Sequence, residues 1–250
     1  MEEALKNKKE GLVFDIGANR GFFTYYLASL GMEVHSFEIF EPNFKALQHG
    51  ILFNPKEVAN RLNLYPVGLG QKTKRFSMKG RDYAGFMKEK GGDGLGDGEL
   101  LGVTFDCFAY HRQMDLDYVA FVKLDVEGFE IAVLKGAQNS LFRKGSKNVG
   151  AMLMEVGPDR WNRAGIEIGE GIEEMVKLSS HFHETNLIVR PSGAPHAKTC
   201  PMSLATKMLK DKNPRNVKNH VIYKVSMKEM GPLVEEMNAN NFDCNFWYIN

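Results

Sequence analysis

The chain has 250 residues, of which 43% are hydrophobic, and its 32 basic and 31 acidic side chains leave a formal net charge of +1. This composition is typical of a globular protein with a sizeable core, and it gives no argument for nucleic-acid or membrane-surface binding. No apolar run approaches the roughly 18 residues of a membrane span, so no membrane partner is expected.

The cysteines and the first residues bear on the compartment. Cys107, Cys200 and Cys244 lie far apart, are odd in number and lack the spacing of metal ligands. We interpret them as reduced intracellular thiols. Residues 1–10 are rich in charge, which leaves no room for a signal peptide unless the natural chain is longer. A cytoplasmic location is therefore expected.

The first predicted strand ends at Asp15 and runs into a turn that contains Gly17 and Gly21, followed by a helix to about Leu30. Glycine at these two positions allows a sharp bend and a close backbone approach that a Cβ atom would block. A turn that joins a strand to a helix in this way lies where α/β sheets bind nucleotide-sized ligands.

The chemistry of this turn favours a ligand without phosphate. The dinucleotide fingerprint G-x-G-x-x-G would need glycine at 17, 19 and 22, but the chain has Gly17, Asn19 and Phe22. Asp15, directly before the turn, would repel a phosphate and suits a ligand with cationic or hydroxyl groups. S-adenosylmethionine, with its ammonium, sulfonium and ribose, is the cofactor predicted from these residues.

A second acidic side chain closes the next predicted strand, at 33–38. Glu38 at this strand end is placed to accept hydrogen bonds from two ribose hydroxyls. The alternative is that Asp15 and Glu38 are strand-end charges in solvent. A helix is predicted to follow from Pro42, a residue favoured in the first turn.

The rest of the chain continues to alternate. Strands are predicted at 62–67, 118–125, 149–156, 184–189 and 242–249, and helices at 127–141 and 171–179. An extra strand pair is expected from 75–78 and 100–105, around a flexible glycine- and aspartate-rich tract at 91–98. This order predicts an α/β fold with a doubly wound, mostly parallel seven-stranded sheet and helices on both faces.

Two blocks of sequence resemble the FkbM type of class I S-adenosylmethionine-dependent methyltransferases. Residues 14–21, Phe-Asp-Ile-Gly-Ala-Asn-Arg-Gly, are similar to the first motif of that class. Residues 121–130, Phe-Val-Lys-Leu-Asp-Val-Glu-Gly-Phe-Glu, are similar to the hallmark of the family. The resemblance covers residues 10–157 well and the remainder loosely. It implies a Rossmann-like methyltransferase fold and methyl transfer to oxygen, with a small molecule or a sugar as acceptor.

The chain departs from the family at the second strand, where the usual motif is Phe-Glu-Pro. Here Ile39 follows Glu38, and a Phe-Glu-Pro sequence appears at 40–42, so that either Glu38 or Glu41 is a candidate to hold the ribose. The length of the strand favours Glu38.

The predicted site lies at the carboxyl ends of the strands, where Asp15, Glu38, Asp125 and Glu155 should converge. The predicted cofactor-binding residues are Asp15, Gly17, Asn19, Gly21, Glu38 and Asp125.

The candidate catalytic residues are Asp125 and Glu127, as a base or as groups that orient the acceptor. Lys123 alternates with them and would share their face if the strand extended that far. Two neighbouring acids can raise each other's pKa, as a base for an alcohol requires. The alternative is that Asp125 holds the methionine ammonium and that Glu127 and Glu130 favour the positive end of the following helix.

One methyltransferase domain is expected over residues 1–250, with a cofactor-binding core at 10–157 and an acceptor-shaping region at 157–243. Basic side chains gather at 207–228 but have acidic neighbours, so we interpret them as a solvated surface and do not expect a nucleic-acid partner. No metal ion is predicted, although Asp125 with a second acid could bind magnesium. Two other functions stay open, a non-catalytic cofactor-binding scaffold or sensor and an NAD-dependent oxidoreductase.

Overall fold

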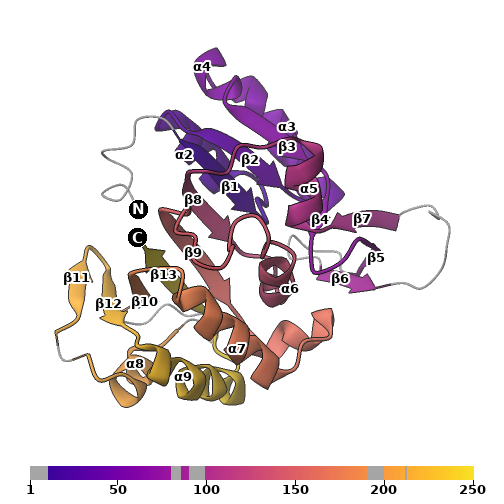
Figure 1. The fold of residues 1–250 in the computed structure, drawn as a ribbon. Helices are drawn as coiled ribbons and strands as arrows, with labels where there is room; N and C mark the ends of the chain where they lie inside the picture. Colours follow the sequence, from indigo (N-terminus) through magenta and orange to yellow (C-terminus); the bar gives the residue numbers. More distant parts are fainter. Residues whose placement is uncertain (1–10, 80–85, 90–98, 191–199, 212) are drawn as a thin grey trace.

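The computed structural model describes residues 11–79, 86–89, 99–190, 200–211 and 213–250. Its centre is a nine-stranded sheet with the order β11-β12-β10-β13-β9-β8-β1-β2-β3 (Figure 1). Parallel pairing joins β1 (Leu12–Ile16), β2 (Glu33–Phe37), β3 (Leu62–Tyr65), β8 (Val119–Leu124) and β9 (Ala151–Val156). The α/β fold predicted from the alternating pattern is confirmed.

In the other half of the sheet, from β9 to β11, neighbouring strands run antiparallel. Strand β13 (Cys244–Ile249) lies antiparallel between β9 and β10 (Glu184–Val189), so β10 runs in the same direction as β9. A hairpin of β11 (Arg215–Val217) and β12 (His220–Lys224) extends the edge beyond β10. The described sheet therefore exceeds the predicted seven strands, because this hairpin lies in the basic region, where exposed residues of β11 hide the strand pattern.

Helices cover both faces of the sheet. Val13 of β1 packs with α2 (Phe22–Ser29) and α4 (Lys56–Ala59), whereas its neighbour Phe14 faces the larger core on the opposite side. That core takes in α5 (Phe105–His111), α6 (Glu130–Lys135), α7 (Ile168–Ser179), α8 (Met202–Met208) and α9 (Met227–Asn240). The remaining helices of the described residues are α3 (Glu41–Gly50) and the 3-10 turns η1 (Ile51–Phe53) and η2 (Pro158–Ala164).

The helix predicted at 127–141 is much shorter than expected, since α6 covers only Glu130–Lys135. Glu127 and Gly128 adopt positive φ angles of 54° and 101°, which no helix can contain. At the other end, a Cβ atom on Gly136 would lie 2.1 Å from the carbonyl oxygen of Gly70. The chain packs tightly here and continues in turns instead of a helix.

A small second sheet has the order β4-β7-β5-β6, formed by β4 (Gly68–Leu69), β5 (Lys74–Lys79), β6 (Phe86–Glu89) and β7 (Glu99–Val103). Antiparallel pairing of β5 with β7 confirms the predicted extra strand pair. Phe105 instead begins α5, which the Thr104 hydroxyl caps by accepting the Cys107 N–H. The tract at 91–98 lies outside the described residues. None of the described helices combines the length and the apolar character that crossing a membrane requires.

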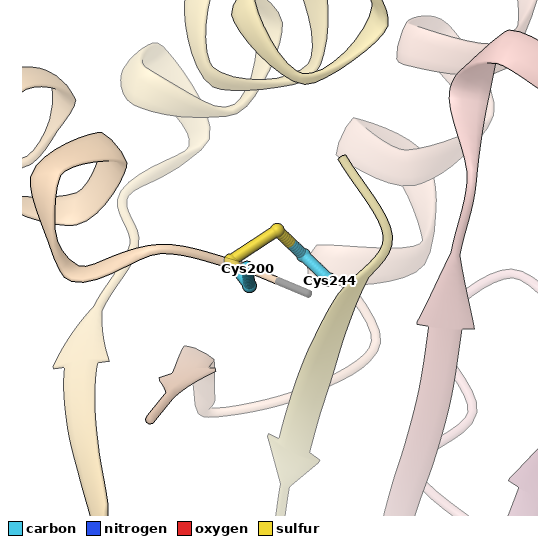
Figure 2. Close-up of a disulfide and its surroundings, with 2 residues drawn as sticks. All are labelled: Cys200 and Cys244. Atoms are coloured by element: carbon cyan, nitrogen blue, oxygen red, sulfur yellow. A yellow bond between two sulfur atoms is a disulfide. The ribbon is translucent and has the colours of Figure 1, made fainter. Parts of the chain in front are cut away.

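Cys200 and Cys244 form a disulfide, which corrects the prediction of three reduced thiols. Figure 2 shows the bond joining the segment before α8 to the first residue of β13. The two cysteines are 44 residues apart in the chain, with their Cα atoms 4.7 Å apart in the fold. Because the pairing depends on the central position of β13, the cysteine spacing alone did not reveal it. One of the observations behind the expected cytoplasmic location is thereby removed.

Candidate active site

The carboxyl ends of the parallel strands meet at one edge of the sheet. The strand register pairs Ile16 with Phe37 and with Leu124, and Leu124 with Met154. This register brings the acidic side chains at the strand ends to the same edge. They are Asp15, Glu38, Asp125 and Glu155.

The turn between β1 and α2 is built from left-handed backbone, with φ angles of 82° at Gly17, 52° at Asn19 and 91° at Gly21. A Cβ atom on Gly17 would lie 1.8 Å from the carbonyl oxygen of Asp125, and one on Gly21 would lie 2.5 Å from the Leu47 side chain. The close approach that these glycines allow is thus to β8 and α3 of the chain itself. It fixes the turn beside the end of β8.

Glu38 holds this turn to the end of β2. Its carboxylate accepts the backbone N–H groups of Asn19 and Phe40, each at 2.7 Å. Burial raises the pKa of Glu38, although these two hydrogen bonds act in the opposite direction. The residue remains 8% exposed. By contrast, Glu41 lies in the exposed first turn of α3 and pairs with Lys45 at 2.6 Å.

A buried lysine joins the turn to β8. Lys123 donates a hydrogen bond to the carbonyl of Gly17, and its Nζ lies 3.6 Å from Asp15 Oδ1 and 3.4 Å from Asp125 Oδ2. Burial acts to lower the pKa of Lys123, but the two carboxylates outweigh it and raise the pKa. The lysine therefore carries its charge and offsets that of the two acids.

Asp15 is fully buried beneath the turn. Its Oδ2 accepts the hydroxyl of Thr24 at 2.6 Å, whereas Oδ1 receives no hydrogen bond from the described residues. The structure thus places this predicted site residue as a support for Lys123 and α2, while Asp125 is 35% exposed at the side chain.

A second charged cluster surrounds Arg160 of η2. Its Nη1 lies 2.7 Å from Glu127 Oε2, and its Nη2 lies 2.8 Å from Asp243 Oδ1 and 3.9 Å from Glu155 Oε1. Asp243 directly precedes β13 and is separated from Arg160 by 83 residues in the chain. No local motif marks Arg160 or Asp243, so neither residue was predicted to lie at the site.

Glu127 lies outside α6, because β8 ends at Leu124 and the chain turns sharply at Glu127 and Gly128. Its carboxylate faces Arg160, and its carbonyl accepts a hydrogen bond from Arg163. These contacts replace the suggested interaction of Glu127 with the positive end of the helix. Glu130 does lie in the first turn of α6, where its carboxylate accepts the Gly128 N–H.

Two carboxyl groups near the cluster have strongly raised pKa values. Burial raises the pKa of Glu155 to about 8, with further contributions from the negative charges of Asp125, Glu127 and Asp243. Burial also raises the pKa of Glu130 to about 7. Raised values of this kind are common at sites that exchange protons. Within the described ranges, no three His, Cys, Asp or Glu side chains are arranged to hold a metal ion.

Three basic side chains of the region 207–228 form ion pairs on the surface, away from this cluster in the chain. Lys207 lies 2.7 Å from Glu236, and Lys224 lies 3.0 Å from Glu184, which also pairs with Arg215. These pairs agree with a solvated surface.

A family model described as a methyltransferase FkbM domain matches residues 15–184. A search of curated proteins returned no match. Among solved structures, the chain is similar to a SAM-dependent methyltransferase from Neisseria gonorrhoeae, with 16% identity, a TM-score of 0.36 and coverage of 63% of this chain and 55% of that one. The chain therefore spans little more than half the length of that protein.

Two further solved structures cover nearly the whole chain. A precorrin-6y C5,15-methyltransferase from Geobacter metallireducens GS-15 is 10% identical, with a TM-score of 0.40 and coverage of 99% of this chain and 85% of that one. A precorrin 8w decarboxylase from Methanobacterium thermoautotrophicum is 11% identical, with a TM-score of 0.42 and coverage of 100% and 90%.

Proposed function

Because the chain belongs to the FkbM family of methyltransferases, we propose that it methylates a hydroxyl group of a small molecule or a sugar. Its cofactor is S-adenosylmethionine. Our choice of acceptor rests on a group of carboxylates beside the turn between β1 and α2, which we call the cofactor turn. Carboxylates accept hydrogen bonds from hydroxyl groups and repel phosphates, which favours a neutral, hydroxyl-bearing acceptor over a nucleic acid. They are Asp125, Glu127, Glu155 and Asp243.

The residues at the turn fit S-adenosylmethionine. Each oxygen of the Glu38 carboxylate accepts one backbone N–H and keeps a further lone pair for a ribose hydroxyl. The partly exposed carboxylate of Asp125 suits an ammonium group, and the buried Asp15 holds Lys123 beneath the turn. We assign cofactor binding to Gly17, Asn19, Gly21, Glu38 and Asp125, and to Asp15 an indirect part through Lys123. When bound, the cofactor supplies a methyl group that its sulfonium activates for attack by the acceptor oxygen.

We assign Asp125 and Glu127 to the acceptor side of the site, where they act on the hydroxyl as a base or by orienting it. Arg160 holds the Glu127 carboxylate at 2.7 Å, so this side chain has a fixed position from which to accept a hydrogen bond. Fixed hydrogen-bond partners bring an acceptor close to a reacting carbon and lower the entropic barrier of transfer.

Calorimetric titration followed by a transfer assay tests this function. We expect S-adenosylmethionine and S-adenosylhomocysteine to bind and NAD to give no heat of binding. With labelled methyl donor, we expect transfer to members of a panel of sugars and hydroxylated small molecules, and none to RNA or protein. Binding without transfer to any acceptor would favour the scaffold or sensor, and binding of NAD alone would favour the oxidoreductase.

A further inference from the structure

Among the four carboxylates beside the cofactor turn, that of Glu155 lies farthest from a basic side chain. Glu127 and Asp243 each make a close contact with Arg160, at 2.7 and 2.8 Å, and Asp125 lies 3.4 Å from Lys123. In the described part of the chain, the carboxylate of Glu155 has only the longer contact of 3.9 Å with Arg160 and accepts no hydrogen bond.

The position of Glu155 also suits contact with a substrate. It is the penultimate residue of β9, the strand that pairs with β8, so its carboxylate shares the sheet edge with Asp125. Its side chain is 30% exposed, whereas that of Asp15 is 1% exposed. A base must reach the proton that it removes, and this exposure leaves a path for an acceptor to Glu155.

We propose that Glu155 is the general base that takes the proton of the acceptor hydroxyl, leaving Asp125 and Glu127 to orient the acceptor. This inference rests on the proposed function. As the acceptor oxygen forms its bond to the methyl carbon, its proton passes to Glu155 and the electron pair of the carbon–sulfur bond leaves with the sulfur. The products are a methyl ether, a neutral thioether and protonated Glu155, which then releases its proton to water.

The charges around Glu155 support this role. Burial and the negative charges of Asp125, Glu127 and Asp243 raise its pKa to about 8, and only Arg160 opposes them. A base with this pKa takes a proton from an alcohol more readily than an ordinary carboxylate, and about a tenth of it is ionised at pH 7. Because the ionised form is the active one, kcat/KM should rise with pH and level off above a midpoint near 8.

Three variants and a control test the proposal. Glu155→Gln should lower kcat by roughly 100-fold or more and leave the Kd for S-adenosylmethionine within about twofold. Glu155→Asp should retain part of the activity. Asp243→Asn removes a negative charge that disfavours ionisation of Glu155, so the midpoint of the pH profile should move to lower pH. Asp117→Asn alters an exposed carboxylate before β8 and should leave the midpoint unchanged.

A direct titration separates this inference from the proposed function. In protein labelled with ¹³C at glutamate carboxyl groups, NMR should show a midpoint near pH 8 that disappears in Glu155→Gln. If the wild type is active, two results would overturn the role of Glu155 alone. One is a Glu155→Gln variant that keeps the kcat of the wild type, and the other is an Asp243→Asn variant whose pH midpoint does not move. A folded wild type that binds the cofactor and methylates no hydroxyl acceptor would overturn both.

Discussion

In the proposed site, the carboxylate of Glu38 both holds the backbone of the chain and binds the cofactor. Its hydrogen bonds to the N–H groups of Asn19 and Phe40 tie the cofactor turn to the end of β2. The contacts that orient the side chain are therefore made before any ligand arrives. Such preorganisation lowers the entropic cost of binding.

Replacing Glu38 with alanine should weaken binding of S-adenosylmethionine by about 1–3 kcal/mol, the range for hydrogen bonds to a charged group. Titration calorimetry measures the change. Glu41→Ala is the matched control, because Glu41 is exposed and pairs only with Lys45 among the described residues. Loss of affinity in the control, with Glu38→Ala unaffected, would move the ribose contact to Glu41.

Asp125→Asn and Glu127→Gln should each lower turnover by about tenfold or more, because an amide in place of a carboxylate accepts a weaker hydrogen bond from the acceptor hydroxyl. The melting temperature should stay close to that of the wild type in Asp125→Asn, whose side chain is partly exposed. Steady-state kinetics measure the effect, with Asp117→Asn as the control. Full activity in both variants would remove these residues from the site.

The sequence predicted the part of the candidate site that lies at the ends of the parallel strands. Asp15, Glu38 and Asp125 each stand at or next to the end of a predicted strand, so their convergence follows from the parallel order of the strands. Arg160 and Asp243 have no such signature, because their meeting depends on how η2 packs near the start of β13. The sequence marked Lys123 only by its alternation with Asp125 and Glu127.

At the scale of elements, the turn between β1 and α2 is fitted against the end of β8. The Asp125 N–H donates to the carbonyl of Ile16, and the Gly17 and Ala18 N–H groups both donate to the carbonyl of Phe37. The turn is therefore held from two neighbouring strands at once, and its shape depends on the absence of a side chain at Gly17.

Gly17→Ala should lower the free energy of unfolding by more than 2 kcal/mol, roughly the sum of a left-handed alanine and a steric clash. The φ angle is +82°, and the new Cβ would lie 1.8 Å from the Asp125 carbonyl oxygen. Urea denaturation measures the loss. Gly145→Ala is the control, because Gly145 has a φ of +79° with nothing within 4 Å of its Cβ position. Equal losses in the two variants would show that the contact with Asp125 is unimportant.

The elements themselves were predictable to different degrees. Strand β10 was predicted with its observed bounds, since the range Glu184–Val189 matches the prediction. The predicted start of α6 was wrong, because Glu127 and Gly128 have a left-handed backbone that their contacts with η2 determine. The hairpin of β11 and β12 was missed because edge strands can carry polar residues on both faces.

At the scale of the whole molecule, the disulfide closes a loop of 44 residues that contains α8, the β11–β12 hairpin and α9. Such a cross-link stabilises a fold chiefly by restricting the unfolded chain. It also anchors the start of β13, next to Asp243, to the segment before α8. Its effect on stability is therefore expected to extend to the charged cluster around Arg160.

Cys200→Ser should lower the free energy of unfolding by about 2–4 kcal/mol under oxidising conditions, as expected for a loop of this length. Urea denaturation measures this loss, and a reducing agent should produce a similar loss in the wild type. Cys107→Ser is the control, because Cys107 is free and only partly buried. If the control and Cys200→Ser lose equally little, the disulfide makes no contribution.

The position of β13 determines the order in which the strands of the sheet can assemble. This strand follows β10 in the chain but lies between β9 and β10 in the sheet. During synthesis, β9 and β10 therefore present unpaired edges to each other and to other chains until residues 244–249 have left the ribosome. Unpaired edges of this kind recruit foreign strands. The nascent chain is thus most exposed to aggregation after β10 has emerged and before β13 has inserted, an interval in which a chaperone has its clearest use.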